Sequence, residues 1–294
     1  MIRLDAPTVL LQWAVGGMFF CWFTTRRRQV GLGYGWLLRG TFGLLAAGAF
    51  AVALASDTVA VRDASSLVTA LVCFVVLGIS IAQRRAGVAG QRAEHDRRTA
   101  RVAAMTGIDR HVPADGAGDG GADGHGDLGR EFDPRLDLLP VATGLVGLVA
   151  AGVAAGGSDA LAIARIVVGA AFLGAVTDAM LLGHWYLVQP GLPRGLLHEL
   201  VNALGWIWPA EVAVMLIPTG MVSVWTGAVD DGWGGTLGWF WAACAATTIV
   251  LVVVTKAALR EREYSAVMAA TGLLYLAILT AFGTDIVARA VLAG

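Results

Sequence analysis

The sequence predicts an all-α, polytopic integral membrane protein with about eight transmembrane helices and both termini outside. Three observations lead to this class. Apolar stretches of close to the roughly 20 residues that cross a bilayer as a helix recur along the chain. Charged residues make up only 15% of the chain, against about 25% in soluble domains. Basic residues gather in alternate connections between the apolar stretches.

The pattern favours helices over a closed barrel. A transmembrane barrel needs segments of roughly ten residues in which apolar and polar side chains alternate. The run from Ile249 to Val254 is apolar throughout, so it does not alternate. We therefore expect a single helical domain over residues 1–294. Its spans are expected at residues 7–23, 35–55, 66–83, 138–158, 161–188, 195–224, 236–256 and 265–288.

Two spans carry further local information. The stretch 7–23 is followed by three arginines at 26–28. A cleaved signal peptide has its basic residues before the apolar run, so we expect this stretch to be retained as a helix. In 138–158, Gly152 and Gly156 lie four residues apart, a spacing that lets helices approach closely. They either pack inside the bundle or form the seam of a homodimer.

The distribution of arginines predicts the orientation. Most of the 21 basic residues fall after the first, third, fifth and seventh stretches, and the opposite side holds Arg3, Arg62, Arg165 and Arg289. The side richer in basic residues is cytoplasmic. Together with the heavy use of Arg and Ala, this favours the inner (plasma) membrane of a bacterium. We expect Arg165 to extend toward the headgroups and Arg289 to pair with Asp285, four residues before it.

The longest connection, residues 84–136, is predicted to be a cytoplasmic loop. Its part from 114 to 129 consists mainly of Gly and Asp. Such a composition has little apolar surface to bury, so we expect this part to be disordered.

A candidate ligand site lies where the fifth and sixth spans meet. The turn at 189–194 makes these spans an antiparallel hairpin, which puts His184 and His198 at similar depth on neighbouring helices. Imidazole binds haem iron and other metals, so these two histidines are also the candidate metal ligands. The predicted ligand-binding residues are His184, Trp185, Tyr186, His198, Asn202 and Trp206.

Acidic residues of the same two spans are candidates for proton exchange. Asp178 and Glu211 are predicted within the membrane, where a charged side chain costs about 2.5–3.5 kcal/mol and faces the bundle interior. Glu199 lies beside His198. Glu211 follows Pro209, and a carboxylate beside an interrupted helix is typical of transporter sites.

Three functions remain open at this point. The first is a respiratory or electron-transfer subunit with a quinone or haem b pocket between the fifth and sixth spans. The second is a small-solute or ion transporter that uses Asp178 and Glu211. The third is a membrane scaffold or assembly subunit without a ligand. The expected partners are the lipid bilayer and other membrane subunits, and the sequence gives no support for nucleic-acid binding. It contains no P-loop, dinucleotide fingerprint or hydrolase motif, and enzymatic activity stays undecided.

Overall fold

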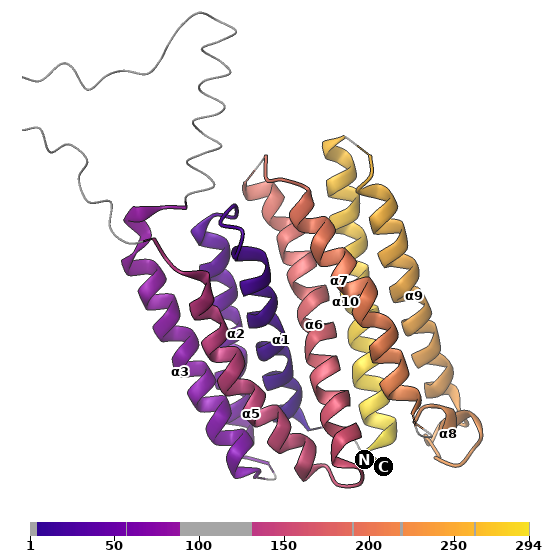
Figure 1. Ribbon diagram of the computed structural model, residues 1–294. Helices are drawn as coiled ribbons and strands as arrows, with labels where there is room; N and C mark the ends of the chain where they lie inside the picture. The colour runs from indigo at the N-terminus through magenta and orange to yellow at the C-terminus, as the bar shows by residue number, and fades with distance from the viewer. Residues whose placement is uncertain are drawn as a thin grey trace, which may run out of the picture.

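A computed structural model describes residues 5–56, 58–88, 131–189, 191–217, 220–261 and 263–293, and these residues form eight long helices and no strand (Figure 1). The long helices are α1 (Ala6–Thr25), α2 (Leu32–Ala53), α3 (Ala60–Ala82), α5 (Leu138–Ala154), α6 (Asp159–Val188), α7 (Gly195–Leu216), α9 (Thr236–Ala258) and α10 (Tyr264–Leu292). Three short elements complete them: η1 (Arg84–Ala86), η2 (Pro134–Asp137) and α8 (Val222–Trp225).

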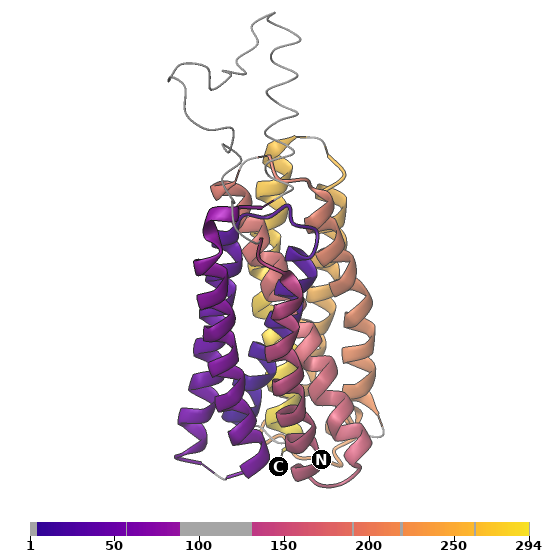
Figure 2. The same ribbon diagram turned by 60° about the vertical axis from the view of Figure 1, so that its left-hand side comes forward.

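The long helices run side by side in alternating directions (Figures 1 and 2). We call the end of the bundle where α1 begins and α10 ends the terminal end, and the opposite end, where α3 ends and η2 begins, the insert end. Segment 89–130 lies outside the described residues, and with it the predicted disorder of 114–129.

The composition of the helices confirms a multi-pass helical membrane protein. Seven of the described long helices are long and apolar enough to cross a membrane. The remaining one, α7, packs between α6 and α9, and its polar residues are His198, Glu199, Asn202 and Glu211. The outward faces are apolar, as a lipid environment requires: Leu44, Val75 and Leu279 are each at least 60% exposed.

The bundle consists of two four-helix rings. In the first ring, α1 packs on α2, α2 on α3, α3 on α5, and α5 on α1. The second ring repeats this order with α6, α7, α9 and α10. Both rings begin with a helix that runs from the terminal end to the insert end, so they are arranged in parallel rather than inverted. The rings meet where α6 packs against α1 and α5, and we call this boundary the seam.

Two glycines let the rings approach at the seam. A Cβ atom on Gly16 of α1 would lie 1.8 Å from the carbonyl oxygen of Ala170, and one on Gly174 of α6 would lie 2.2 Å from the carbonyl carbon of Gly16. Neither position has room for a side chain, so the backbones of α1 and α6 are in contact. Such close packing through small residues is a main source of helix association in lipid.

A buried ion pair fastens the first ring at the insert end. Arg39 of α2 is 1% exposed, and its Nε and Nη2 atoms donate to the two carboxylate oxygens of Asp137 at 2.6 and 2.8 Å. Its Nη1 atom donates to Ser80 Oγ of α3 at 3.3 Å, and the guanidinium lies 4.3 Å from the centre of the Phe132 ring. All three guanidinium nitrogens of Arg39 therefore have a partner.

The prediction for the sixth span was wrong at its end. Residues 195–224 were expected as one helix, but α7 ends at Leu216 and α8 begins only at Val222. Ile217 adopts an extended conformation with φ −92° and ψ 145°. The next residue in the sequence is Pro218, and a residue before proline is disfavoured in the helical conformation. The preference of a residue before proline for an extended conformation therefore explains why α7 ends at Leu216.

Candidate functional site

The last helix carries a fully buried ion pair at the seam. Asp285 and Arg289 lie one turn apart on α10, and Arg289 Nε donates to Asp285 Oδ2 at 2.8 Å. Both side chains are 0% exposed. The predicted pairing is therefore confirmed, but the pair is enclosed within the bundle. Because two charges removed from water carry a large desolvation cost, their surroundings decide what this pair does.

Gln12 connects this pair to the other ring. Gln12 is a fully buried residue of α1, and its Nε2 atom donates to Asp285 Oδ1 at 3.3 Å. Gly169 of α6 makes room for the contact, since a Cβ atom there would lie 2.5 Å from Gln12 Nε2 and 2.7 Å from Asp285 Oδ1. The two rings are therefore joined by a polar contact as well as by packed backbones.

Glu211 of α7 completes the group. Its side chain is 0% exposed, and its carboxylate interacts electrostatically with Asp285 and Arg289. We call Gln12, Glu211, Asp285 and Arg289 the seam cluster. They come from three helices and both rings.

The seam cluster has more hydrogen-bonding capacity than its members use. Both carboxylate oxygens of Glu211 lack a hydrogen-bond partner among the described residues, and so do Nη1 and Nη2 of Arg289 and Oε1 of Gln12. Buried polar atoms are nearly always paired in proteins, and each unpaired one costs about 1–3 kcal/mol. The concentration of such atoms at one place distinguishes this cluster from a structural ion pair.

Arg165 supports the cluster from α6, and the expectation that it extends toward the headgroups was wrong. Arg165 is only 5% exposed. Its Nε and Nη2 atoms donate to the backbone carbonyls of Val214 and Ile217 at 2.9 and 2.6 Å. These carbonyls belong to the last turn of α7 and the residue after it, where a helix carries partial negative charge. Arg165 therefore fixes the end of the helix that bears Glu211.

Asp178 is buried as predicted, but it lies apart from the seam cluster. Its Oδ1 atom accepts a hydrogen bond from the Tyr34 hydroxyl at 3.4 Å, and its Oδ2 atom has no partner among the described residues. Along α6 it lies nine residues nearer the insert end than Gly169, which corresponds to roughly 13 Å. The two predicted intramembrane carboxylates thus occupy different depths.

The two predicted histidines contact different helices. His184 is exposed on α6, with Nδ1 at 3.3 Å from the hydroxyl of Tyr275 on α10. His198 is half-buried on α7, with Nε2 at 3.1 Å from the carbonyl oxygen of Leu259 at the end of α9. Among the described residues, no group of three or more His, Cys, Asp or Glu side chains is arranged as a metal site. The quinone, haem and metal roles of these histidines stay predictions.

The aromatic residues of the predicted pocket do not face a common space. Trp185 donates through Nε1 to Gln189 at 3.2 Å, and the hydroxyl of the buried Tyr186 donates to the carbonyl of Pro193 at 2.8 Å. These bonds stabilise the turn between α6 and α7. Trp206, by contrast, is 82% exposed on the outer surface of α7.

Asn202 and Glu199, the predicted polar residues near His198, lie in different environments. Asn202 is half-buried on α7. Glu199 forms ion pairs with Arg26 and Arg27 of the first ring, the former at 3.3 Å. The carboxylate of Glu199 thus fastens the two rings at the insert end, where a surface ion pair contributes at most about 1 kcal/mol.

Gln12, Asp285 and Arg289 were not predicted as site residues, although the sequence contained a signal. Each is a polar or charged residue inside an otherwise apolar stretch, and such residues are costly enough in a membrane to mark functional sites. Their convergence was not visible because helical phase gives the face of a residue but not the helix that this face meets.

The chemistry of the seam cluster fits the exchange of a proton. Asp285 is paired with Arg289, whereas the Glu211 carboxylate accepts no hydrogen bond from the described residues and comes within hydrogen-bond reach of Asp285 once one of the two carboxyl groups carries a proton, so Glu211 is the member whose charge is able to change. A proton binds covalently to a carboxylate oxygen and tolerates a nearby guanidinium. A metal cation would be repelled by Arg289. Comparison with protein-family models, with curated proteins and with solved structures found no match to this chain.

Proposed function

We propose that this protein is a membrane transporter that moves protons, alone or together with a small solute, and that Glu211 is its proton-exchange residue. The observation that carries the proposal is the enclosed Glu211 carboxylate, which accepts no hydrogen bond from the described residues although it interacts electrostatically with Asp285 and Arg289. A carboxylate held this way changes its protonation with little rearrangement of its surroundings. It is therefore suited to repeated loading and release.

The architecture supports a transporter. Many transporters consist of two related halves, with the substrate or coupling-ion site between them, and work by a rocking motion of one half against the other. Here the two rings share the same order of neighbours and the same direction, and the seam cluster draws Gln12 from one ring and its other members from the second. A change in the charge of Glu211 would act directly on the boundary between the rings.

The proposal is tested with Glu211→Gln in proteoliposomes. A trapped pH-sensitive dye reports proton entry after an imposed pH gradient, and we expect the substitution to abolish the flux of the wild-type protein. Glu263→Gln is the matched control, because it makes the same chemical change at an exposed position just before α10. It is expected to leave the flux unchanged. Equal flux in the wild type and Glu211→Gln would refute the assignment.

Infrared spectroscopy covers the case in which proton movement requires a co-transported solute. A carboxyl group that gains a proton acquires a C=O stretching band that a carboxylate lacks. We expect such a band to appear as the pH is lowered and to be missing in Glu211→Gln. A wild-type protein that shows neither proton flux nor a Glu211-dependent band would contradict the proposal in both its forms.

An electron-transfer subunit in a bacterial inner membrane is the second candidate, and one contact favours it. His184 and Tyr275 form a polar pair on the exposed surface of α6 and α10. A quinone diffusing in the bilayer would meet this pair from the lipid side. Absorption spectra and quinone extraction of the purified protein test this candidate. If neither haem nor quinone is found, the electron-transfer hypothesis fails and the proton-exchange proposal is unaffected.

A further inference from the structure

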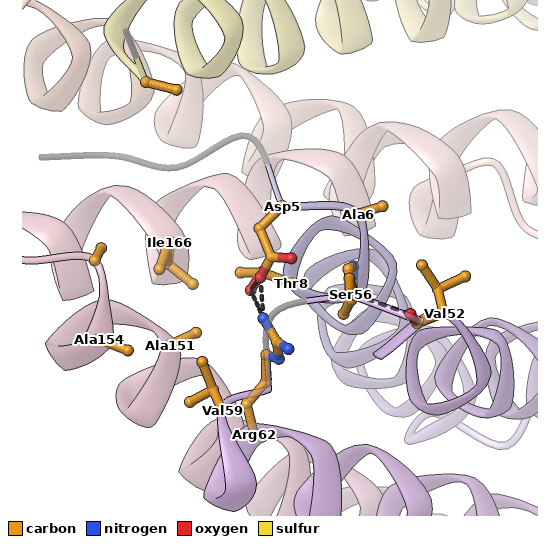
Figure 3. Close-up of a pocket in the computed structure, with 13 residues that line it drawn as sticks. Asp5, Ala6, Thr8, Val52, Ser56, Val59, Arg62, Ala151, Ala154 and Ile166 are labelled. Carbon is orange, nitrogen blue, oxygen red and sulfur yellow. Dashed lines mark hydrogen bonds and ion pairs between the residues drawn. The ribbon is translucent and has the colours of Figure 1, made fainter. Parts of the chain in front are cut away.

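A cavity of about 480 Å³ opens at the terminal end of the bundle (Figure 3). Its walls come from the start of α1, the connection between α2 and α3, the end of α5 and the first half of α6. The residues that matter below are Asp5, Thr8, Ala151, Ala155, Ile166 and Ala293. Most of the cavity is therefore formed by the first ring, and Ile166 of α6 and Ala293 at the end of α10 line it from the second.

The cavity has a polar side that suits water. Arg62 of α3 pairs with Asp5, and both line the cavity, where Figure 3 shows them facing one another. Arg62 also donates to the hydroxyl of Thr8 at 3.3 Å. A cavity of this size with charged and hydroxyl groups in its wall has room for on the order of ten waters and offers them hydrogen-bond partners.

The cavity lies directly beyond the seam cluster on the same helix faces. On three helices, a cavity residue and a residue at the seam are three or four positions apart, so they share a face. The pairs are Thr8 with Gln12 on α1, Ile166 with Gly169 on α6, and Ala293 with Arg289 at the end of α10. One helical turn, roughly 6 Å, therefore separates the floor of the cavity from the cluster.

We infer that this cavity is a water-filled vestibule through which protons reach Glu211 from the terminal end. The inference rests on the proposed proton exchange and adds its direction of access. Water in the vestibule carries protons to its floor near Thr8 and Ile166. From there a proton crosses about one helical turn to reach the seam cluster. By the predicted orientation, the vestibule opens to the outside of the cell.

Thiol labelling tests the vestibule without any transport measurement. Ala151 lines the cavity and is 6% exposed, whereas Ala70 is 3% exposed in the hydrophobic core of the same ring. In nanodiscs, we expect Ala151→Cys to react with a charged, membrane-impermeant maleimide and Ala70→Cys to stay unlabelled. The wild-type protein serves as the blank, because its three cysteines are buried. An unreactive Ala151→Cys, or equal labelling of both variants, overturns the inference, whatever Glu211→Gln does.

A second variant tests whether protons use the vestibule. Ala155→Trp places an indole in the cavity wall at the end of α5, and Val153→Trp is the control on the same helix, at a position that is 52% exposed and outside the cavity. We expect Ala155→Trp to lose most of the Glu211-dependent signal, either the proton flux or the rate at which the infrared band appears after a pH jump. Val153→Trp should keep it. Full signal in Ala155→Trp overturns the vestibule while leaving proton exchange at Glu211 standing.

Discussion

The two rings each enclose an arginine–aspartate pair, and the pairs differ in how completely they are satisfied. Arg39 of the first ring uses all three guanidinium nitrogens, two of them on Asp137 and one on Ser80. Arg289 uses one, on Asp285, and its two terminal nitrogens have no hydrogen-bond partner among the described residues. Both arginines are buried and both are paired with an aspartate, so neither burial nor the presence of an ion pair identifies a functional site. What distinguishes the second ring is that the hydrogen-bonding groups of Arg289 are only partly used.

This difference separates two roles of buried charge. A saturated pair holds its helices in one arrangement, because any movement breaks good hydrogen bonds. An unsaturated group has already lost its bonds to water, and it gains when a water molecule enters or, for a carboxylate such as Glu211, when a proton binds, so its surroundings are prepared for a second state. The ion pair of Arg39 in the first ring therefore has the properties of a structural element. The ion pair of Arg289 at the seam has the properties of a functional site.

The largest expected effect follows from breaking the saturated pair. Arg39→Leu leaves Asp137 buried, and among the described residues Thr25 and Cys21 are the remaining side-chain hydrogen-bond donors to its carboxylate. Removing one partner of a buried pair costs about 3–5 kcal/mol, so we expect a large fall in the thermal unfolding temperature of the purified protein. Arg85→Leu, at an exposed position within η1, is the control and should change little.

A double substitution sharpens this test. In Arg39→Leu with Asp137→Leu no unpaired charge remains, so the double variant is expected to be more stable than Arg39→Leu alone. If the two variants unfold at the same temperature, the stability is lost because the packing contacts of the Arg39 side chain are lost. The ion pair with Asp137 would then not be what stabilises the first ring.

The next effect concerns the contact between the rings. Gly174→Ala places a Cβ atom against the backbone of Gly16, which cannot move without separating α1 from α6. Overpacking of this kind costs about 1–3 kcal/mol, which thermal unfolding in detergent would detect. Gly78→Ala on α3 is the control, since a Cβ atom there meets nothing within 4 Å. Equal stability of both variants would mean that the rings are not pressed together at the seam.

The sequence predicted the helices because crossing a membrane is a local property of composition. Every predicted span overlaps a long helix, and the main error, the end of the sixth span, lies beside a proline whose effect on Ile217 was not included. The hairpin of α6 and α7 was also expected correctly, since these two helices pack together.

The site was only partly predictable, because it depends on which helices meet. The cost of a charge in lipid marked Glu211 and Asp178 from the sequence alone. His184 and His198 were expected to share a pocket because they lie at similar depth, but equal depth does not fix the direction of a side chain. Asp285 and Arg289 were expected to pair, and their convergence with Gln12 required the position of α1 against α6 and α10.

Gly169→Ala is expected to change the stability less than Gly174→Ala does, and to change the proton flux more. A Cβ atom in Gly169→Ala meets the ends of the Gln12 and Asp285 side chains rather than backbone. The Gln12 side chain is able to shift, so the loss of stability should be smaller than for Gly174→Ala. Its displacement disturbs the seam cluster, and we expect the Glu211-dependent proton flux to fall. Unchanged flux would show that the contact between Gln12 and Asp285 is not needed for exchange.

The smallest expected change in stability is at the residue proposed to be most important for function. Glu211→Gln removes a buried carboxylate that has no hydrogen-bond partner among the described residues and replaces it with a neutral group of the same shape. The substitution removes the desolvation cost of the charge and its repulsion from Asp285, which outweighs the lost attraction to Arg289, so the unfolding temperature should equal or exceed that of the wild type. Asp285→Asn is the contrasting variant, because it weakens the pair with Arg289 and should lower that temperature. If Glu211→Gln destabilised the protein as much as Arg39→Leu does, the Glu211 carboxylate would be as firmly bound as Asp137. The distinction between a saturated and an open site would then be lost.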